Sequence, residues 1–170
     1  MKRGNKPALI AAGLIVCAII FIAGCARDSD IADEPEITVE SLSGDYAQQL
    51  IRDGAELIFG SISLRHDETG EVWTDITEKE YIEDPSQPNG FYIAYKNLES
   101  TYQLSSEARA TFIGGGSDKA EAMNADEFAA AVERDNSEYG ADNPDYQENK
   151  LYDIYVMGDQ IELLIARYIP

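Results

Sequence analysis

Residues 151–169 read LYDIYVMGDQIELLIARYI, and this stretch decides the fold because it contains two strands and the turn that joins them. Branched and aromatic residues dominate both halves, which is typical of β-strands. Gly158 and Asp159 stand between the halves, and a glycine in the first central position is what a two-residue type II′ turn requires. Because an isolated hairpin is only marginally stable in water, the stretch predicts a larger sheet to which this hairpin belongs.

Earlier segments have the composition of further strands. Residues 71–82 alternate between two faces as a strand does, and residues 91–95 are rich in aromatic and branched side chains. The loop between them, residues 84–90, contains two prolines and an Asn-Gly pair. In chain order, the strands predicted before the hairpin are 57–65, 71–82, 91–95, 101–104 and 108–113.

Two helices are predicted. The first covers residues 45–53 and is followed by Gly54, and a glycine is favoured just past the end of a helix. Residues 124–134 form the stronger pattern, because Asn124 can cap the first turn and Glu127 stands three residues later, as in a capping box. The expected fold is therefore mainly β with one or two helices, built as a small antiparallel β-barrel or a curved sheet. An OB-like barrel is one form of this fold, and an α+β open sheet is the alternative.

The first 25 residues have the features of an export signal. Three basic residues fall within the first six positions, and the 18 residues before Cys25 carry no charge. The apolar run ends on Ile22, Ala23, Gly24 and Cys25. This ending resembles the lipobox of bacterial lipoproteins. The resemblance implies a signal peptide over residues 1–24 that is removed, and a diacylglycerol on Cys25 that attaches the chain to a membrane.

The resemblance also implies a location. Basic residues before the apolar run place the rest of the chain on the extracytoplasmic side of the cell membrane, and two acyl chains give stable anchoring. The alternative is an uncleaved membrane helix, for which 18 uncharged residues are near the lower limit of length. Residues 25–36, CARDSDIADEPE, are acidic and are expected to form a disordered tether behind the lipidated cysteine. Residues 37–170 have the length of a single globular β-rich domain.

The charge of the chain is strongly negative. There are 13 Lys and Arg against 32 Asp and Glu, a formal charge of −19. Because nucleic-acid binding needs a basic surface, that class of function is excluded, and the expected partners are basic proteins, cations or neutral sugars. Cys17 lies in the leader and Cys25 is the expected lipid site. The domain therefore has no disulfide, no cysteine nucleophile and no thiolate metal site.

The residue types that catalysis needs are sparse. His66 is the only histidine, so the chain cannot build a multi-histidine zinc site, and no Gly-x-Ser-x-Gly motif accompanies it. Beside Asp67 and Glu68, His66 is expected in a solvated turn. We therefore expect no enzymatic activity. The alternative is a small carbohydrate-active enzyme that uses two carboxylates, whose positions the sequence does not mark.

The acidic segment after the second predicted helix is a candidate for a weak calcium site. Its spacing fails the EF-hand pattern, because Tyr146 occupies the position of the bidentate glutamate. The remaining candidate is a looser cage of oxygen ligands from Asp135, Glu138, Asp142 and Asp145. No other cofactor is expected.

Aromatic side chains are the candidate ligand contacts, because they bury a large area at a small entropic cost. The candidates are Trp73, Tyr92 and Tyr152. The alternative for each is a place in the core or in a cross-strand pair. Residues 114–117, GGGS, lack the ending of a phosphate-binding P-loop and are interpreted as a flexible linker.

Two further segments read DPSQPNGFYI at residues 84–93 and IARYIP at residues 165–170. Both are similar to parts of small uncharacterised lipoproteins of gut-type bacteria, and the similarity implies the fold more than an activity. The expected function is a membrane-anchored, non-catalytic domain that binds an envelope or secreted protein. The alternative is a weak calcium-dependent binder of a ligand or glycan.

Overall fold

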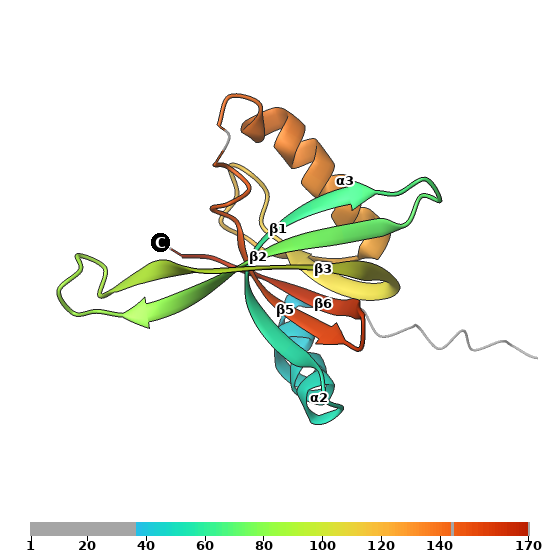
Figure 1. Cartoon of the computed structure of the whole chain (residues 1–170), viewed down its shortest axis with the longest axis horizontal. Helices are drawn as coiled ribbons and strands as arrows, with labels where there is room; N and C mark the ends of the chain where they lie inside the picture. Colours follow the sequence, from blue (N-terminus) through green and yellow to red (C-terminus); the bar gives the residue numbers. More distant parts are fainter. Residues whose placement is uncertain (1–36, 144, 170) are drawn as a thin grey trace, which may run out of the picture. The chain divides into compact units, whose positions relative to one another are not determined.

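The structure is a computed structural model that describes residues 37–143 and 145–169, all within one compact unit (Figure 1). The expected signal peptide and tether lie outside the described residues. So do the lipobox residues Ile22, Ala23 and Gly24 and the lipidation site Cys25, and these expectations stay predictions. Among the described residues, no helix has both the length and the apolar character that crossing a membrane requires.

Six strands and two helical segments make up the described part of the chain. The first helical segment joins α1 (Val39–Ser41), a π-helical turn η1 (Leu42–Tyr46) and α2 (Ala47–Arg52). The second joins α3 (Ala125–Asp135) and a π-helical turn η2 (Asn136–Gly140). The strands are β1 (Glu56–His66), β2 (Val72–Glu83), β3 (Phe91–Phe112), β4 (Glu121–Asn124), β5 (Leu151–Met157) and β6 (Gln160–Arg167).

The strands form one curved sheet that is nearly closed into a ring. The order is β2-β1-β5-β6-β3-β4, and β2 also pairs with β3, so five strands form a nearly closed ring and β4 adds to the edge of β3. The mainly β, curved-sheet fold predicted from the sequence is therefore confirmed. One pair departs from the antiparallel expectation, because β3 and β6 run parallel after the crossover through α3. A partly open ring of five strands is what an OB-like barrel has.

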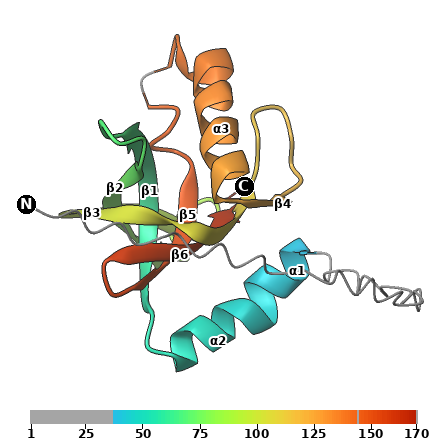
Figure 2. The same ribbon diagram turned by 90° about the vertical axis from the view of Figure 1, so that its right-hand side faces the viewer.

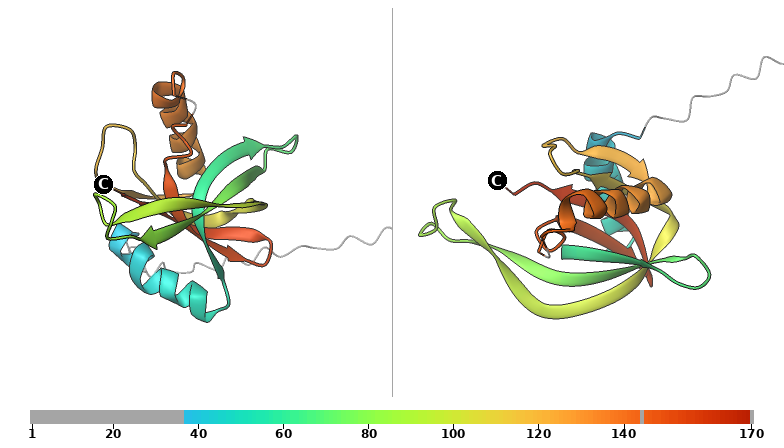
Figure 3. Two further views of the ribbon diagram at one scale, coloured as in Figure 1. Left: turned by 60° about the vertical axis from the view of Figure 1, so that its left-hand side comes forward. Right: turned by 90° about the horizontal axis from the view of Figure 1, so that it is seen from above.

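Strand β3 is a single strand of 22 residues, where the sequence predicted three separate strands (Figure 3). Its first part, Phe91–Gln103, pairs with β2, and its last part, Gln103–Ala110, pairs with β6. The largely polar stretches that interrupt the apolar pattern, 96–100 and 105–107, lie at or beside the two register shifts of β3, one against β2 and one against β6. The strand continues through both irregularities, and apolar periodicity alone does not indicate this continuity.

Helix α3 packs its apolar side against the interior of the ring. Its Phe128 is fully buried between Phe112 of β3 and Tyr152 of β5, with ring centroids 6.1 and 5.8 Å away in edge-to-face geometry. The predicted start of the helix is confirmed. Asn124 Oδ1 accepts the main-chain N–H of Glu127 at 2.9 Å, and Glu127 accepts the N–H of Asn124 at 3.1 Å.

A second apolar cluster lies between the first helical segment and the β5–β6 hairpin (Figure 2). Leu42, Ala47 and Leu50 pack there against residues such as Tyr155 and Leu163. The helix begins six residues before the predicted start at residue 45. The hairpin itself is confirmed, including its turn, where Gly158 has a φ of +66° that a side chain would strain.

Candidate functional site

Strands β1 and β2 separate beyond the pair Gly60–Glu78. From there β1 pairs with β5, whereas β2 continues with β3 as a two-stranded arm made of residues 79–83 and 91–95 (left in Figure 1). The strands come very close just before they part, because a Cβ on Gly60 would lie 2.4 Å from the carbonyl oxygen of Thr77. Only glycine allows this approach. Gly60 therefore permits the close approach at the base of the fork, where the two strands part.

An open pocket of about 480 Å³ lies at this fork, and we call it the aromatic cleft. Its aromatic lining comes from Phe59 of β1, Tyr81 of β2, Phe91 of β3 and Tyr168 after β6. The rings of Tyr81 and Phe91 stack with centroids 4.8 Å apart. Tyr81 and Tyr168 are exposed, and the two phenylalanines are half-buried. Such a gathering of exposed aromatic side chains is typical of a binding surface.

The polar lining of the aromatic cleft contains an ion pair. Arg167 Nη1 donates to Asp153 Oδ2 at 3.2 Å. Burial raises the pKa of Asp153, although the neighbouring Arg167 acts in the opposite direction. Glu80 also lines the aromatic cleft, with an exposed side chain.

The base of the arm is fixed to the loop before β5. Lys79 is buried, and its ammonium donates to the main-chain carbonyl of Glu148. The same ammonium lies 4.7 Å from the ring centroid of Tyr95, whose hydroxyl donates to Glu148 Oε2 at 3.0 Å. Burial lowers the pKa of Lys79, and Glu148 opposes that shift. These contacts hold one wall of the aromatic cleft in place.

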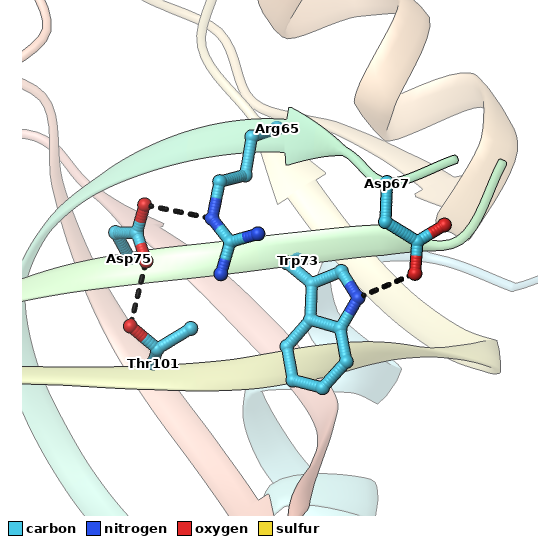
Figure 4. A network of polar contacts seen from close by, with 5 residues as sticks. All are labelled: Arg65, Asp67, Trp73, Asp75 and Thr101. Atoms are coloured by element: carbon cyan, nitrogen blue, oxygen red, sulfur yellow. Dashed lines mark hydrogen bonds and ion pairs between the residues drawn. The ribbon is translucent and has the colours of Figure 1, made fainter. Parts of the chain in front are cut away.

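A second surface feature lies on β1, β2 and β3, and we call it the Trp73 network (Figure 4). Its members are Arg65, Asp67, Trp73, Asp75 and Thr101. Asp75 accepts hydrogen bonds from Arg65 Nε at 3.2 Å and from the Thr101 hydroxyl at 2.6 Å. The guanidinium of Arg65 lies 5.6 Å from the ring centroid of Trp73, a cation–π distance. Trp73 Nε1 donates to Asp67 Oδ2 at 3.1 Å.

Asp67 organises the turn between β1 and β2. Its Oδ1 accepts the hydroxyl of Thr69 at 2.6 Å and the main-chain N–H groups of Thr69 and Glu71 at 2.8 and 3.0 Å. The Thr69 hydroxyl and the Trp73 indole are the main reasons that the pKa of Asp67 falls to about 2. Near this network is an open pocket of about 430 Å³ whose lining includes Asp75 and Thr101. The rest of its polar side-chain lining is Ser61, Ser63, Thr77, Glu99, Ser100, Gln147 and Glu148.

The three aromatic residues chosen from the sequence lie in three different places. Trp73 is half-buried in the network just described. Tyr92 is 42% exposed on the arm, paired with Ile82 and so on the face opposite Tyr81. Tyr152 is only 1% exposed, which corrects its choice as a ligand contact. The alternating pattern of β5 turns it inward against Phe128.

The four acids proposed for a calcium cage do not come together. Asp135 is buried and ion-paired with Lys150 at 2.7 Å, whereas Glu138, Asp142 and Asp145 are exposed. Within residues 37–143 and 145–169, no group of three or more His, Cys, Asp or Glu could hold a metal ion. The candidate cage loses its first ligand because a lysine already neutralises that carboxylate.

His66 lies at the end of β1, and its Nε2 is 3.0 Å from Glu133 Oε1 on α3. Both side chains are about half exposed. The contact joins residues 67 positions apart, so the sequence neighbours Asp67 and Glu68 gave no indication of it. An exposed pair of this kind is a surface contact, and surface ion pairs contribute little to stability.

The aromatic cleft was not foreseen from the sequence. Its four aromatic residues are spread over more than 100 positions, and only the aromatic-rich FYIAY segment at 91–95 gave a local signal. Comparison with known proteins adds no assignment, because no family model, no curated protein and no solved structure matches the chain.

Proposed function

We propose that the chain is a membrane-anchored extracytoplasmic lipoprotein whose domain binds another envelope or secreted protein through the aromatic cleft, without catalysis. The observation that carries the proposal is the aromatic cleft itself. It gathers Phe59 of β1, Tyr81 of β2, Phe91 of β3 and Tyr168 after β6 around one open pocket.

Several properties of the aromatic cleft suit a protein partner. Interfaces concentrate their binding energy in a few aromatic and arginine side chains that become fully buried in the complex. The cleft supplies four aromatic rings and Arg167, and its volume of about 480 Å³ is enough to receive one or two side chains. Lys79 holds the arm at its base, so binding would order few additional groups.

The lipobox-like ending at Cys25 supports the anchored part of the proposal. A lipid on Cys25 and an acidic tether would hold the domain near the membrane, where partner concentration is high. The net charge of −19 supports a basic partner over an anionic one.

The test uses the full chain on intact cells, with crosslinking, affinity purification and mass spectrometry. Tyr81→Ala should abolish capture of the partner, whereas Tyr92→Ala should not. Tyr92 is the matched control because it is a tyrosine of the same arm with similar exposure, 42% against 48%. Cys25→Ser should release the chain from the membrane. A partner captured equally well by both tyrosine variants would contradict a role for the aromatic cleft.

A neutral glycan at the Trp73 network is the second candidate function. Sugars are commonly bound by an aromatic face together with fixed hydrogen-bonding groups. Here Arg65 joins the Trp73 indole to Asp75, and the pair Asp75–Thr101 lines the pocket of about 430 Å³. Trp73 is the only tryptophan, so its fluorescence reports directly on this surface. Titration with envelope oligosaccharides should change the emission, and Asp75→Asn should remove that change. Unaltered emission with every oligosaccharide would count against this candidate.

A further inference from the structure

The aromatic cleft borders an unpaired strand edge. Among the described residues, β2 pairs with β1 only as far as Glu78, so Lys79–Glu83 has a neighbouring strand on the β3 side alone. We call its other side the open edge. Lys79, Glu80 and Tyr81 all line the aromatic cleft. Since consecutive residues of a strand point to opposite faces, a cleft that touches all three lies along the edge of the strand.

We propose that the open edge binds an extended, basic segment of the partner protein as an added β-strand. The proposal rests on the proposed function and specifies how the partner is recognised. A strand edge presents main-chain N–H and C=O groups that are ready to pair with another chain. Peptide binding by strand addition uses these groups for affinity and side-chain pockets for specificity.

The aromatic cleft supplies the side-chain pocket. Side chains of the added strand would alternate between two faces, and those on the Tyr81 side would enter the space between Tyr81, Phe91 and Phe59. An apolar residue at alternate positions of the partner segment therefore fits the site. The five residues Lys79–Glu83 span about 17 Å, so a segment of about five to seven residues is long enough.

Charge selects a basic segment. Glu80 and Glu83, on the strand that carries the open edge, are both exposed, and Glu80 lines the aromatic cleft. Lys79 of the same strand is buried, and Arg167 forms an ion pair with Asp153 that carries no net charge. The exposed charge along Lys79–Glu83 is therefore negative.

The same charge disfavours a second copy of the chain. Pairing of two open edges would place the exposed Glu80 and Glu83 of both copies along one ladder of about five residues, in a chain with a formal charge of −19. Like charges placed opposite each other on neighbouring strands are destabilising, and natural edges use them to prevent self-association. An added strand that carries lysine or arginine would instead be attracted by these glutamates.

The test measures binding of a synthetic peptide to residues 25–170 of the chain, with the substitution Cys25→Ser. The peptide has about seven residues, with valine and lysine alternating around a central phenylalanine. Two control peptides carry glutamate in place of lysine, or proline at alternate positions, which removes main-chain donors. Binding is measured by calorimetry at two salt concentrations, and strand addition is measured by amide hydrogen exchange.

The basic peptide should bind, and neither control peptide should. Binding should slow exchange at alternate amides within Lys79–Glu83, because only every second N–H points to the open edge. Changing Glu80 and Glu83 together to glutamine should weaken binding about tenfold at low salt and less at high salt. Glu99→Gln is the control, because Glu99 lies on β3 and not on the open edge. It should have little effect on binding of the peptide.

Three results would overturn strand addition. They are no binding of the basic peptide up to about 1 mM, equal binding of the proline-containing peptide, and a concentration-dependent dimer of the unbound chain that protects the same amides. If a cellular partner is still lost on Tyr81→Ala while the amides of Lys79–Glu83 stay unprotected, strand addition is wrong and the proposed function stands. If the partner is unaffected by Tyr81→Ala, both proposals fail.

Discussion

The ammonium of Lys150 lies 2.7 Å from the carboxylate of Asp135, and both groups are largely buried. Lys150 also donates to the carbonyl of Ile113 at 2.7 Å, and Asp135 accepts the N–H of Gly115 at 2.6 Å. The pair thus joins the end of α3, the glycine loop after β3 and the loop before β5. Residues 114–117, interpreted from their sequence as a flexible linker, are instead held by this contact.

Removing one member of this pair should lower the free energy of unfolding much more than removing an exposed charge does. Lys150→Met leaves the Asp135 carboxylate buried without its counter-ion, so we expect a loss of about 3–5 kcal/mol in urea unfolding. Lys96→Met, which removes the more exposed partner of Glu78, should cost at most about 1 kcal/mol. The double variant Asp135→Leu/Lys150→Met should lose less than the two single losses combined. Additive losses would show that the pair is not coupled.

Gly115 is expected to tolerate no side chain. A Cβ there would lie 2.4 Å from the ring of Tyr139 and 2.6 Å from the hydroxyl of Tyr146. Gly115→Ala should therefore destabilise the domain by about 1–3 kcal/mol, as overpacking does. Gly44→Ala is the control, because it lies in the first helical segment with no atom within 4 Å of a new Cβ. It should be neutral or stabilising by up to about 1 kcal/mol. Equal thermal midpoints for the two variants would contradict the close packing.

Phe128 should be among the residues on which the fold depends most. Phe128→Ala removes the ring that fills the space between Phe112 and Tyr152, so we expect a loss of about 3–5 kcal/mol in chemical denaturation. Phe91→Ala is the comparison, because Phe91 is half-buried in the aromatic cleft. It should change stability much less and weaken partner binding instead. If Phe91→Ala lowered the free energy of unfolding more than Phe128→Ala does, the fold would not depend on Phe128 as expected.

Asp67 should make the stability of the domain depend on acidic pH. Its pKa is 3.8 in the unfolded chain and about 2 in the folded domain, so folding favours the ionised carboxylate. Its contribution is present above pH 3.8 and is lost as the pH falls toward 2. Asp67→Asn should therefore flatten the decline of stability over this range, whereas Glu68→Gln, a change at its exposed neighbour, should not. Acid titration followed by the emission of Trp73 measures both variants.

Local structure was predictable where a segment carries its own signal. The Gly158-Asp159 turn and the capping pair Asn124–Glu127 each lie within a few residues, and both are present as expected. The continuity of β3 and the short strand β4 were missed. Both depend on main-chain pairing with strands far away in the sequence, and main-chain groups are the same in every residue.

The candidate site was less predictable than the fold. Of the three aromatic residues chosen as ligand contacts, Tyr92 is exposed and Trp73 is half-buried, but Tyr152 is in the core. The sequence shows that a strand has two faces without showing which face the ring encloses. Asp135 was chosen for its charge, and only the fold revealed that Lys150 neutralises it.

The sequence alone determined the mainly β class, the final hairpin, the capped helix and the strongly negative charge, because composition and short-range patterns are properties of the chain itself. Only the tertiary structure decided that β3 closes the ring by a parallel pair with β6, that β1 and β2 part at Gly60, and that four distant aromatic residues meet at that fork. The physical reason is that closure and separation of strands depend on twist and packing summed over the whole sheet. The sequence of a short segment does not determine the twist and packing of the whole sheet.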